Sequence, residues 1–345
     1  MARDCRKHST VSPRNSSAWR TDVLIWSDTL FVVIAALAFD ALIGDPDWLW
    51  RRLSHPVALI GSLIGLLDRS LNLETRSPVQ RKFAGIIVVI LLLAISALSG
   101  ILIAMALRQI AFGNVLIGLI ASTLIAQRSL YQHVARVRSA FADGGLAEAR
   151  RAVAMVVGRD PDQLDAAGVC RAAIESCAEN FSDGVVAPVF WLALLGLPGL
   201  IAYKAINTAD SMIGHRSTRY ESFGWAAARL DDLVNLIPAR LSGLLVAIVA
   251  PIAGGTTGSA LRVMWRDAAK HHSPNAGWPE SATAGALGLA LAGPRRYGER
   301  IVDDPFLNAE ARKDAMPSDI GRSLDLLVAA CLFEAAAYAA LALVV

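Results

Sequence analysis

Long stretches without a charged residue constrain this chain more than any other feature. Residues 83–107 form 25 consecutive positions without a charge, rich in Ile, Leu and Val, and a run of this length can cross a bilayer as a helix. The other long apolar runs are 29–44, 109–127, 241–261 and 326–345. The composition agrees, because 54% hydrophobic and only 18% charged residues are unusual for a water-soluble enzyme. The sequence therefore predicts an all-α, polytopic integral membrane protein with about five transmembrane helices.

Several apolar segments are expected to depart from simple crossings. Segment 184–203 is interrupted by Gly196, Pro198 and Gly199, which break a helix, so we expect a broken or re-entrant helix lining a protein-enclosed cavity. Segment 281–294 is too short to cross and predicts a buried or re-entrant helix. Run 109–127 should form a tight hairpin with 83–107, while Pro251 should end the run 241–261 early.

The flanks of the apolar runs predict domain organisation and orientation. Residues 1–28 are polar, basic and serine-rich, which predicts a disordered tail ahead of a single membrane-embedded catalytic domain at 29–345. Segments 45–82 and 262–324 are rich in Lys and Arg, so the positive-inside rule places both in the cytoplasm. We therefore expect a multi-pass protein of the cell (inner) membrane whose site faces the cytoplasm. No basic stripe with interleaved aromatic residues suggests a nucleic-acid partner.

Polar residues gather between positions 175 and 240, against an apolar background. Glu175, Glu179 and Asp183 are spaced by four residues, so one helix would place all three carboxylates on one stripe. Like charges there repel, and a hard cation such as Mg²⁺ would offset the repulsion. Surface salt bridges are the structural alternative. The predicted metal ligands are Glu179, Asp183, Asp210, Asp231 and Asp232. The predicted catalytic residues are Glu175, Glu179, Asp210 and Asp232.

Basic and amide side chains near these acids could hold phosphate or carboxylate oxygens. The predicted substrate- and phosphate-binding residues are Lys204, Arg159, Arg229, Arg240, Asn180, Asn207, Asn235, Ser211, His55, Asp45, His272 and Asn275. Turn or capping roles remain open for Asp45, His55 and Arg159, and H-H-S-P-N-A-G (271–277) could simply connect two elements. The chain contains no G-x-x-x-x-G-K-[ST] loop and no dinucleotide fingerprint, so a nucleotide would need a non-standard site.

Five motifs, in this order, resemble those of the adenosylcobinamide-phosphate synthases, the CobD/CbiB family of cobalamin biosynthesis. They are F-D-A-L-I-G-D-P with S-H-P-V-A-L-I-G; V-G-R-D with A-I-E-S-C-A-E-N-F-S-D-G-V-V-A-P; Y-K-A-I-N-T-A-D-S-M-I-G; A-R-L-D-D-L-V-N-L-I-P-A-R; and H-S-P-N-A-G followed by A-G-A-L-G-L-A-L-A-G. The resemblance covers about residues 33–305. It departs at Ala209, where the family usually has Leu, and at Ala292-Gly293, where it usually has L-G-G.

The resemblance implies an amide-forming ligase. Family members join the free propionate of adenosylcobyric acid to (R)-1-amino-2-propanol phosphate, with ATP as co-substrate and Mg²⁺. The expected partners are the corrinoid and aminopropanol phosphate substrates, the lipid bilayer and other late cobalamin-pathway enzymes. The residues alone leave two alternatives open: a membrane prenyltransferase that binds an isoprenoid diphosphate through Mg²⁺, and a non-enzymatic transporter whose intramembrane acids bind protons or cations.

Overall fold

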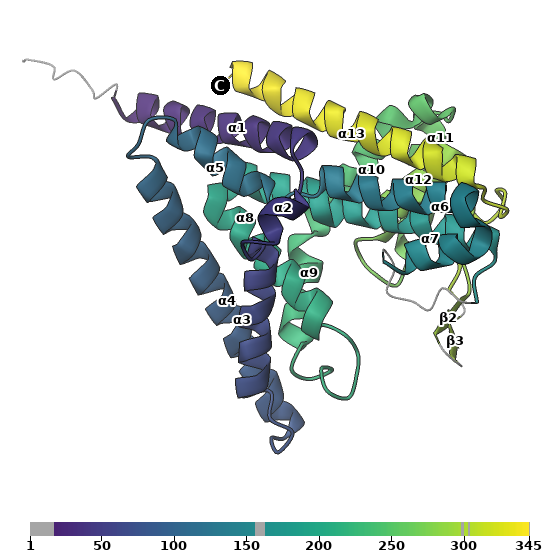
Figure 1. The fold of residues 1–345 in the computed structure, drawn as a ribbon, viewed down its shortest axis with the longest axis horizontal. Coiled ribbons are helices and arrows are strands. Elements are labelled where there is room, and N and C mark those ends of the chain that lie inside the picture. Colours follow the sequence, from purple (N-terminus) through teal and green to yellow (C-terminus); the bar gives the residue numbers. More distant parts are fainter. Residues whose placement is uncertain (1–16, 156–162, 298–299, 303, 345) are drawn as a thin grey trace, which may run out of the picture.

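The computed structural model describes residues 17–155, 163–297, 300–302 and 304–344, and the chain is almost entirely helical there (Figure 1). The helices are α1 Ser17–Leu42, α2 Asp47–Trp50, α3 Pro56–Leu71, α4 Pro78–Leu107, α5 Gly113–Ser122, α6 Gln127–Ala154, α7 Ala166–Phe181, α8 Ala187–Ile213, α9 Trp225–Val234, α10 Leu236–Val249, α11 Thr257–Asp267, α12 Gly277–Leu287 and α13 Pro317–Val344. A π-helical turn, Ser182–Val186, joins α7 to α8, and two 3₁₀ turns, Ala250–Ala253 and Ala268–Lys270, follow α10 and α11.

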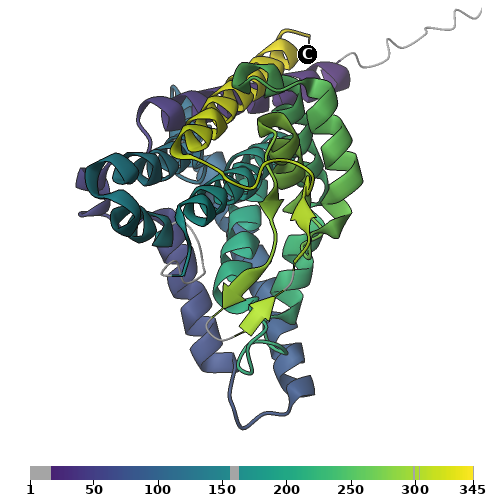
Figure 2. The same ribbon diagram turned by 90° about the vertical axis from the view of Figure 1, so that its right-hand side faces the viewer.

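Short strands complete the fold on one side of the molecule (Figure 2). β1 (Leu291–Ala292) pairs antiparallel with β4 (Phe306–Leu307), with Leu291 opposite Leu307. β2 (Arg295–Tyr297) pairs antiparallel with β3 (Arg300–Val302). β1 lies against α7 and α12, and β4 lies against α12.

Five helical segments in the described part of the chain are long and apolar enough to cross a membrane, which confirms the predicted class. They are Pro78–Arg108, Gly113–Ala154, Ala166–Ile213, Leu236–Ala253 and Pro317–Val344. The apolar run 29–44 belongs to α1, which lies outside this set. α4 presents Phe83, Ile87 and Ile90 outward, each more than half exposed, as expected of a lipid-facing surface.

Two expectations from the sequence are wrong. Run 109–127 follows α4 through a tight turn at 108–112, as expected, but it is not one helix, because α5 ends at Ser122 and α6 begins only at Gln127. Close packing shapes the turn before α5, where a Cβ on Gly113 would lie 1.9 Å from the Leu107 carbonyl oxygen. Residues 17–28 belong to α1 rather than to a disordered tail.

Two other expectations are confirmed. α10 gives way at Ala250 to a 3₁₀ turn containing Pro251, and the chain then turns at Gly254, whose φ is 78°. Segment 281–294 begins inside α12, in which every residue except Trp278 is buried, and the helix ends before Gly288, whose φ is 66°.

The segment 184–203 reverses direction, as its Gly and Pro residues predict. Gly196 adopts φ 66° and ψ −161°, and Pro198 follows it inside α8. The Tyr203 hydroxyl lies 3.0 Å from the carbonyl oxygen of Asp183, twenty residues earlier. A straight helix would separate these residues by about 30 Å. The chain therefore folds back on itself at Gly196 instead of continuing as a straight helix.

The core has two parts that meet along α8. The larger contains buried residues of α1, α5, α6, α7, α10, α12 and α13, and α1 and α13 lie side by side along one edge (Figure 1). The smaller lies between α3, α4, α8 and α9, around Ile64, Leu92, Ile206 and Phe223. Since α8 contributes to both, it connects the projecting α3–α4 hairpin to the main body.

Candidate functional site

Five carboxylates from α7, the π-turn, α8 and α9 come together, and we call them the acid cluster: Glu179, Asp183, Asp210, Asp231 and Asp232. Asp183 interacts electrostatically with Glu179 and Asp231, and Asp210 interacts with Asp231 and Asp232. The structure thus brings the five predicted metal ligands into one neighbourhood. Among the described residues, no three His, Cys, Asp or Glu side chains are grouped tightly enough to hold a metal ion by themselves.

The π-turn places Asp183 in the cluster. In a π-turn the backbone hydrogen bonds skip an additional residue, and such turns often occur at functional sites. Two carbonyl groups of this turn are used by tertiary donors instead: the Asp183 carbonyl faces the Tyr203 hydroxyl at 3.0 Å, and the Gly184 carbonyl accepts the Ala126 N–H at 2.9 Å. The turn is therefore fixed from both α8 and the start of α6.

Asp231 is the most enclosed acid that α9 contributes. Asn207 Nδ2 donates to its Oδ1 at 3.3 Å, and Asn235 Nδ2 donates to its Oδ2 at 3.0 Å. The Tyr203 hydroxyl lies 3.0 Å from Asn235 Oδ1, which orients that amide. Burial, and next the negative charge of Asp210, raise the pKa of Asp231 to about 7, against the opposing effect of the two amide hydrogen bonds.

A basic residue links the acid cluster to the first motif of the chain. Lys204 interacts electrostatically with Asp183 and with Asp45. The Asp45 carboxylate lies 3.2 Å from His55 Nε2, while His55 Nδ1 accepts the Val57 N–H at 3.2 Å and caps α3. Because Nδ1 is an acceptor, Nε2 carries the proton and donates to Asp45. The capping role and the site role thus coincide in His55.

Other predicted substrate-binding residues surround α9 and α10. Arg229 pairs with Asp232 at 3.4 Å. Asn275 Nδ2 donates to the Asp232 carbonyl at 2.8 Å, so the loop 271–277 is fixed to the end of α9. The Arg240 guanidinium lies 4.4 Å from the centre of the Trp278 ring and bonds the Leu236 carbonyl, which places it in the interface between α10 and α12.

The remaining predicted residues lie elsewhere or face other partners. Glu175 is buried, and its Oε1 accepts the Ala292 N–H at 2.9 Å, so this carboxylate faces β1. Asn180 donates to Ser176 in its own helix, and Ser211 donates to the Asn207 carbonyl. His272 is largely exposed, 4.0 Å from Asp304. Arg159 and the rest of V-G-R-D lie outside the described residues.

Tyr203 belongs to the site although the sequence did not single it out. An aromatic residue beside an apolar run usually indicates core packing, and Tyr203 is indeed only 3% exposed. Its hydroxyl nevertheless joins the π-turn to Asn235. The signal that could have revealed this role is its position directly before Lys204 in the polar motif Y-K-A-I-N-T-A-D.

Known proteins are similar to this chain over most of its length. The model of a family described as CobD/Cbib protein matches residues 33–327. A Sinorhizobium protein named "Cobalamin biosynthesis protein CobD" is 50% identical over 322 residues, covering 92% of this chain and 100% of the relative. Proteins of the same name from Rhizobium meliloti and Rhodobacter capsulatus are each 48% identical, covering 92% and 86% of this chain and 98% and 91% of the relatives. No solved structure shows significant similarity to the chain.

Proposed function

This chain belongs to the CobD/CbiB family of cobalamin biosynthesis proteins, and from that premise we propose that it is an adenosylcobinamide-phosphate synthase. The reaction joins adenosylcobyric acid, through its free propionate, to (R)-1-amino-2-propanol phosphate, and forms an amide. The observation that carries the proposal is the convergence of the acid cluster, Lys204 and the Asp45–His55 pair from four separate motifs. Membership in a cobalamin biosynthesis family argues against the prenyltransferase and transporter alternatives.

The acid cluster has the donor chemistry that a magnesium ion requires. Burial and the charge of Asp210 raise the pKa of Asp231 to about 7, and a divalent cation would offset this repulsion between carboxylates. Mg²⁺ is usually held by one or two carboxylates together with water and substrate phosphates. Asp183 and Asp231 would hold it, with Asp210 and Asp232 close by. The ion would neutralise charge on the transferring phosphoryl group of ATP.

Amide formation from a carboxylate requires activation, and ATP would supply it. A propionate oxygen attacks the γ-phosphorus, the bond to the β-phosphate oxygen breaks, and an acyl phosphate and ADP result. The amine nitrogen then attacks the acyl carbon, phosphate leaves, and one proton must be removed from nitrogen. Lys204 would hold anionic oxygens during both steps. Glu179, the exposed carboxylate of the cluster, would accept the proton and return it to water.

The test of the proposed function uses a deletion strain supplied with different corrinoids. A strain lacking this protein should fail to make cobalamin from cobyric acid but should still use cobinamide, which already carries the amide. Purified protein with ATP, Mg²⁺, adenosylcobyric acid and aminopropanol phosphate should yield a product with the mass of adenosylcobinamide phosphate. Cobalamin synthesis from cobyric acid by the deletion strain would overturn the proposal.

A further inference from the structure

Residues 214–224, G-H-R-S-T-R-Y-E-S-F-G, form a closed loop between α8 and α9. The two ends of the loop touch: a Cβ on Gly224 would lie 1.6 Å from the carbonyl oxygen of Ile213 and 3.2 Å from the Cα of Gly214. Only glycine permits this approach. The loop is thus a compact surface excursion whose two ends meet at the last turn of α8, close to Asp210. Loops of this kind are frequently functional.

A set of polar groups around the buried Asp68 and Asn72, which we call the clasp, fixes the far end of this loop to the α3–α4 hairpin. The clasp residues are Asp68, Asn72, Arg81, Arg219 and Tyr220. Asp68, only 7% exposed, accepts hydrogen bonds from Arg219 at 2.8 Å and from Asn72 at 2.8 Å. Arg81 donates to Asn72 Oδ1 at 2.8 Å and also to the Arg219 carbonyl. The loop therefore has one defined position.

The near end of the loop lies against the acid cluster. The Gly214 N–H donates to the Asp210 carbonyl at 2.8 Å, and a Cβ on Gly214 would lie 2.0 Å from Asp210 Oδ1. His215 interacts electrostatically with Asp210. The first residues of the loop thus border one carboxylate of the proposed reaction centre.

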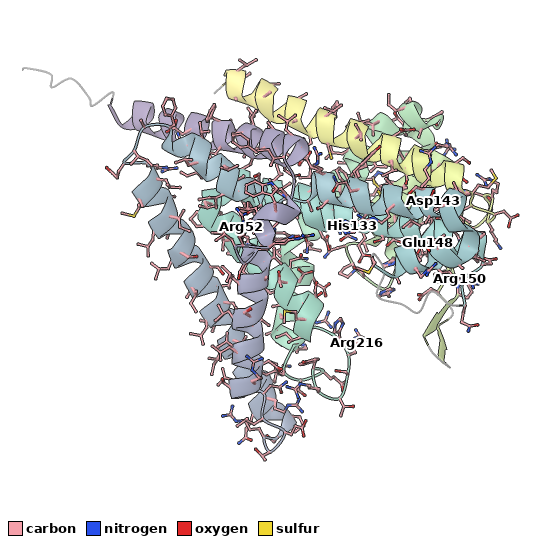
Figure 3. All side chains as sticks on the ribbon, in the orientation of Figure 1. Arg52, His133, Asp143, Glu148, Arg150 and Arg216 are labelled. Carbon is pink, nitrogen blue, oxygen red and sulfur yellow. The ribbon has the colours of Figure 1, made fainter. Side chains whose placement is uncertain are left out.

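Exposed donors follow directly in the loop. His215, Arg216, Ser217 and Thr218 are all exposed, and Figure 3 shows Arg216 on this loop beside α9. Within the described part of the chain, the Arg216 guanidinium forms no ion pair or hydrogen bond with a side chain. A guanidinium, an imidazole and hydroxyl groups held together are the donors that recognise phosphate.

We infer that the loop 214–224 is a phosphate-binding element, in which His215 and Arg216 hold a phosphate group of an anionic substrate beside Asp210. The inference rests on the proposed function, because it takes the acid cluster as the reaction centre. The phosphate belongs either to the amine substrate or to ATP; both present the same oxygen donors to the loop. The clasp keeps the loop in place while the phosphate binds.

Calorimetric titration of the full-length protein in detergent with Mg²⁺ tests the inference. Aminopropanol phosphate, unphosphorylated aminopropanol and ATP are titrated separately into wild type, Arg216→Ala, Arg216→Lys and Arg69→Ala. Arg216→Ala should weaken binding of one phosphorylated ligand about tenfold or more, since hydrogen bonds to charged groups are strong. The ligand whose affinity falls identifies the source of the phosphate. Arg216→Lys should lose less of this affinity than Arg216→Ala. Arg69→Ala removes a charge of the same type on α3 and should bind both phosphorylated ligands like wild type.

The outcomes separate this inference from the proposed function. His215→Ala is titrated in the same way. Unchanged affinity of both Arg216→Ala and His215→Ala for both phosphorylated ligands overturns the inference, even if the enzyme forms the amide. Arg216-dependent phosphate binding by a wild-type protein that makes no amide would sustain the inference and overturn the proposed function. Thermal melting of each variant, compared with wild type, confirms that a lost affinity reflects the missing donor and not an unfolded protein.

Discussion

Two acid-cluster carboxylates belong to Glu179, on α7, and Asp210, near the end of α8. Replacing either with Ala should lower amide formation by about 100-fold or more. For Glu179 the reason is that a carboxylate positioned for proton transfer contributes this much, and for Asp210 the reason is that its charge borders the proposed Mg²⁺ site. Expression and membrane insertion should match wild type, since neither side chain belongs to the apolar core. The measurement is product formed per membrane-inserted protein, with Asp143→Ala on the exposed surface of α6 as control (Figure 3). Wild-type rates for both variants would show that these acids are structural.

Glu175 should behave differently from its neighbours in the same motif. Its buried carboxylate accepts the Ala292 N–H at 2.9 Å, so Glu175→Ala would leave that N–H buried and unpaired. We expect a loss of about 1–3 kcal/mol in the free energy of unfolding, measured as a lower midpoint of thermal unfolding in detergent. Glu175→Gln retains an acceptor oxygen and should lose less. A stable but inactive Glu175→Ala protein would instead support the catalytic role predicted from spacing.

Residue spacing was enough to predict the acid cluster, because its members belong to three motifs and converge once α7, α8 and α9 pack. Spacing could not predict the partner of Glu175, since Ala292 is 117 residues away and its position depends on β1. The role of Tyr203 was missed for a similar reason: its hydroxyl reaches the π-turn only because the chain reverses at Gly196.

At the scale of elements, Asp267 stabilises the end of α11 through charge. Burial would raise the pKa of its carboxyl, but hydrogen bonds from Arg266, Lys270 and the Asn308 N–H outweigh burial and hold the pKa well below its usual value. The native state therefore binds fewer protons than the unfolded state. The stabilisation is complete above the unfolded pKa of about 3.9 and is lost as the pH falls through and below that value.

The lowered pKa of Asp267 predicts that the protein loses stability in acid. The unfolding midpoint of wild type should fall as the pH is lowered from about 5 to about 2, while Asp267→Asn should start lower and change less. Thermal melts across that range, for both proteins in the same detergent, measure the difference. Parallel curves for the two proteins would show that Asp267 is not the group responsible.

Among the elements, long uninterrupted apolar runs were predicted well because burial in lipid depends mainly on composition. The division of run 109–127 into α5 and the start of α6 was not predicted, because apolar composition does not distinguish one helix from two helices joined by the turn at 123–126. Likewise the segment 45–82, counted as a basic loop, contains α3, whose N-terminus is capped by His55.

For the molecule as a whole, the reversal at Gly196 bears on how the chain lies in the membrane. If the segment 184–203 turns back without crossing, residues before and after it share one side. Single cysteines at Asp165 and Ser217, both exposed, in a background lacking the native four, should then react alike with an impermeant thiol reagent. Opposite labelling of the two positions would mean that this segment crosses and that the site assembles from both faces.

The π-turn at Ser182–Val186 has a consequence for how such a site can arise in evolution. A π-turn contains about one residue more than the α-helical turn it replaces. Deleting a single residue there would restore continuous α-helical hydrogen bonding. The Asp183 and Gly184 carbonyls would then no longer accept hydrogen bonds from Tyr203 and Ala126. The carboxylate of Asp183 would rotate away, while the apolar faces on either side could keep their packing. A three-base insertion into a gene that encodes a continuous α-helix is therefore enough to create the π-turn that positions Asp183. A three-base deletion would remove that turn.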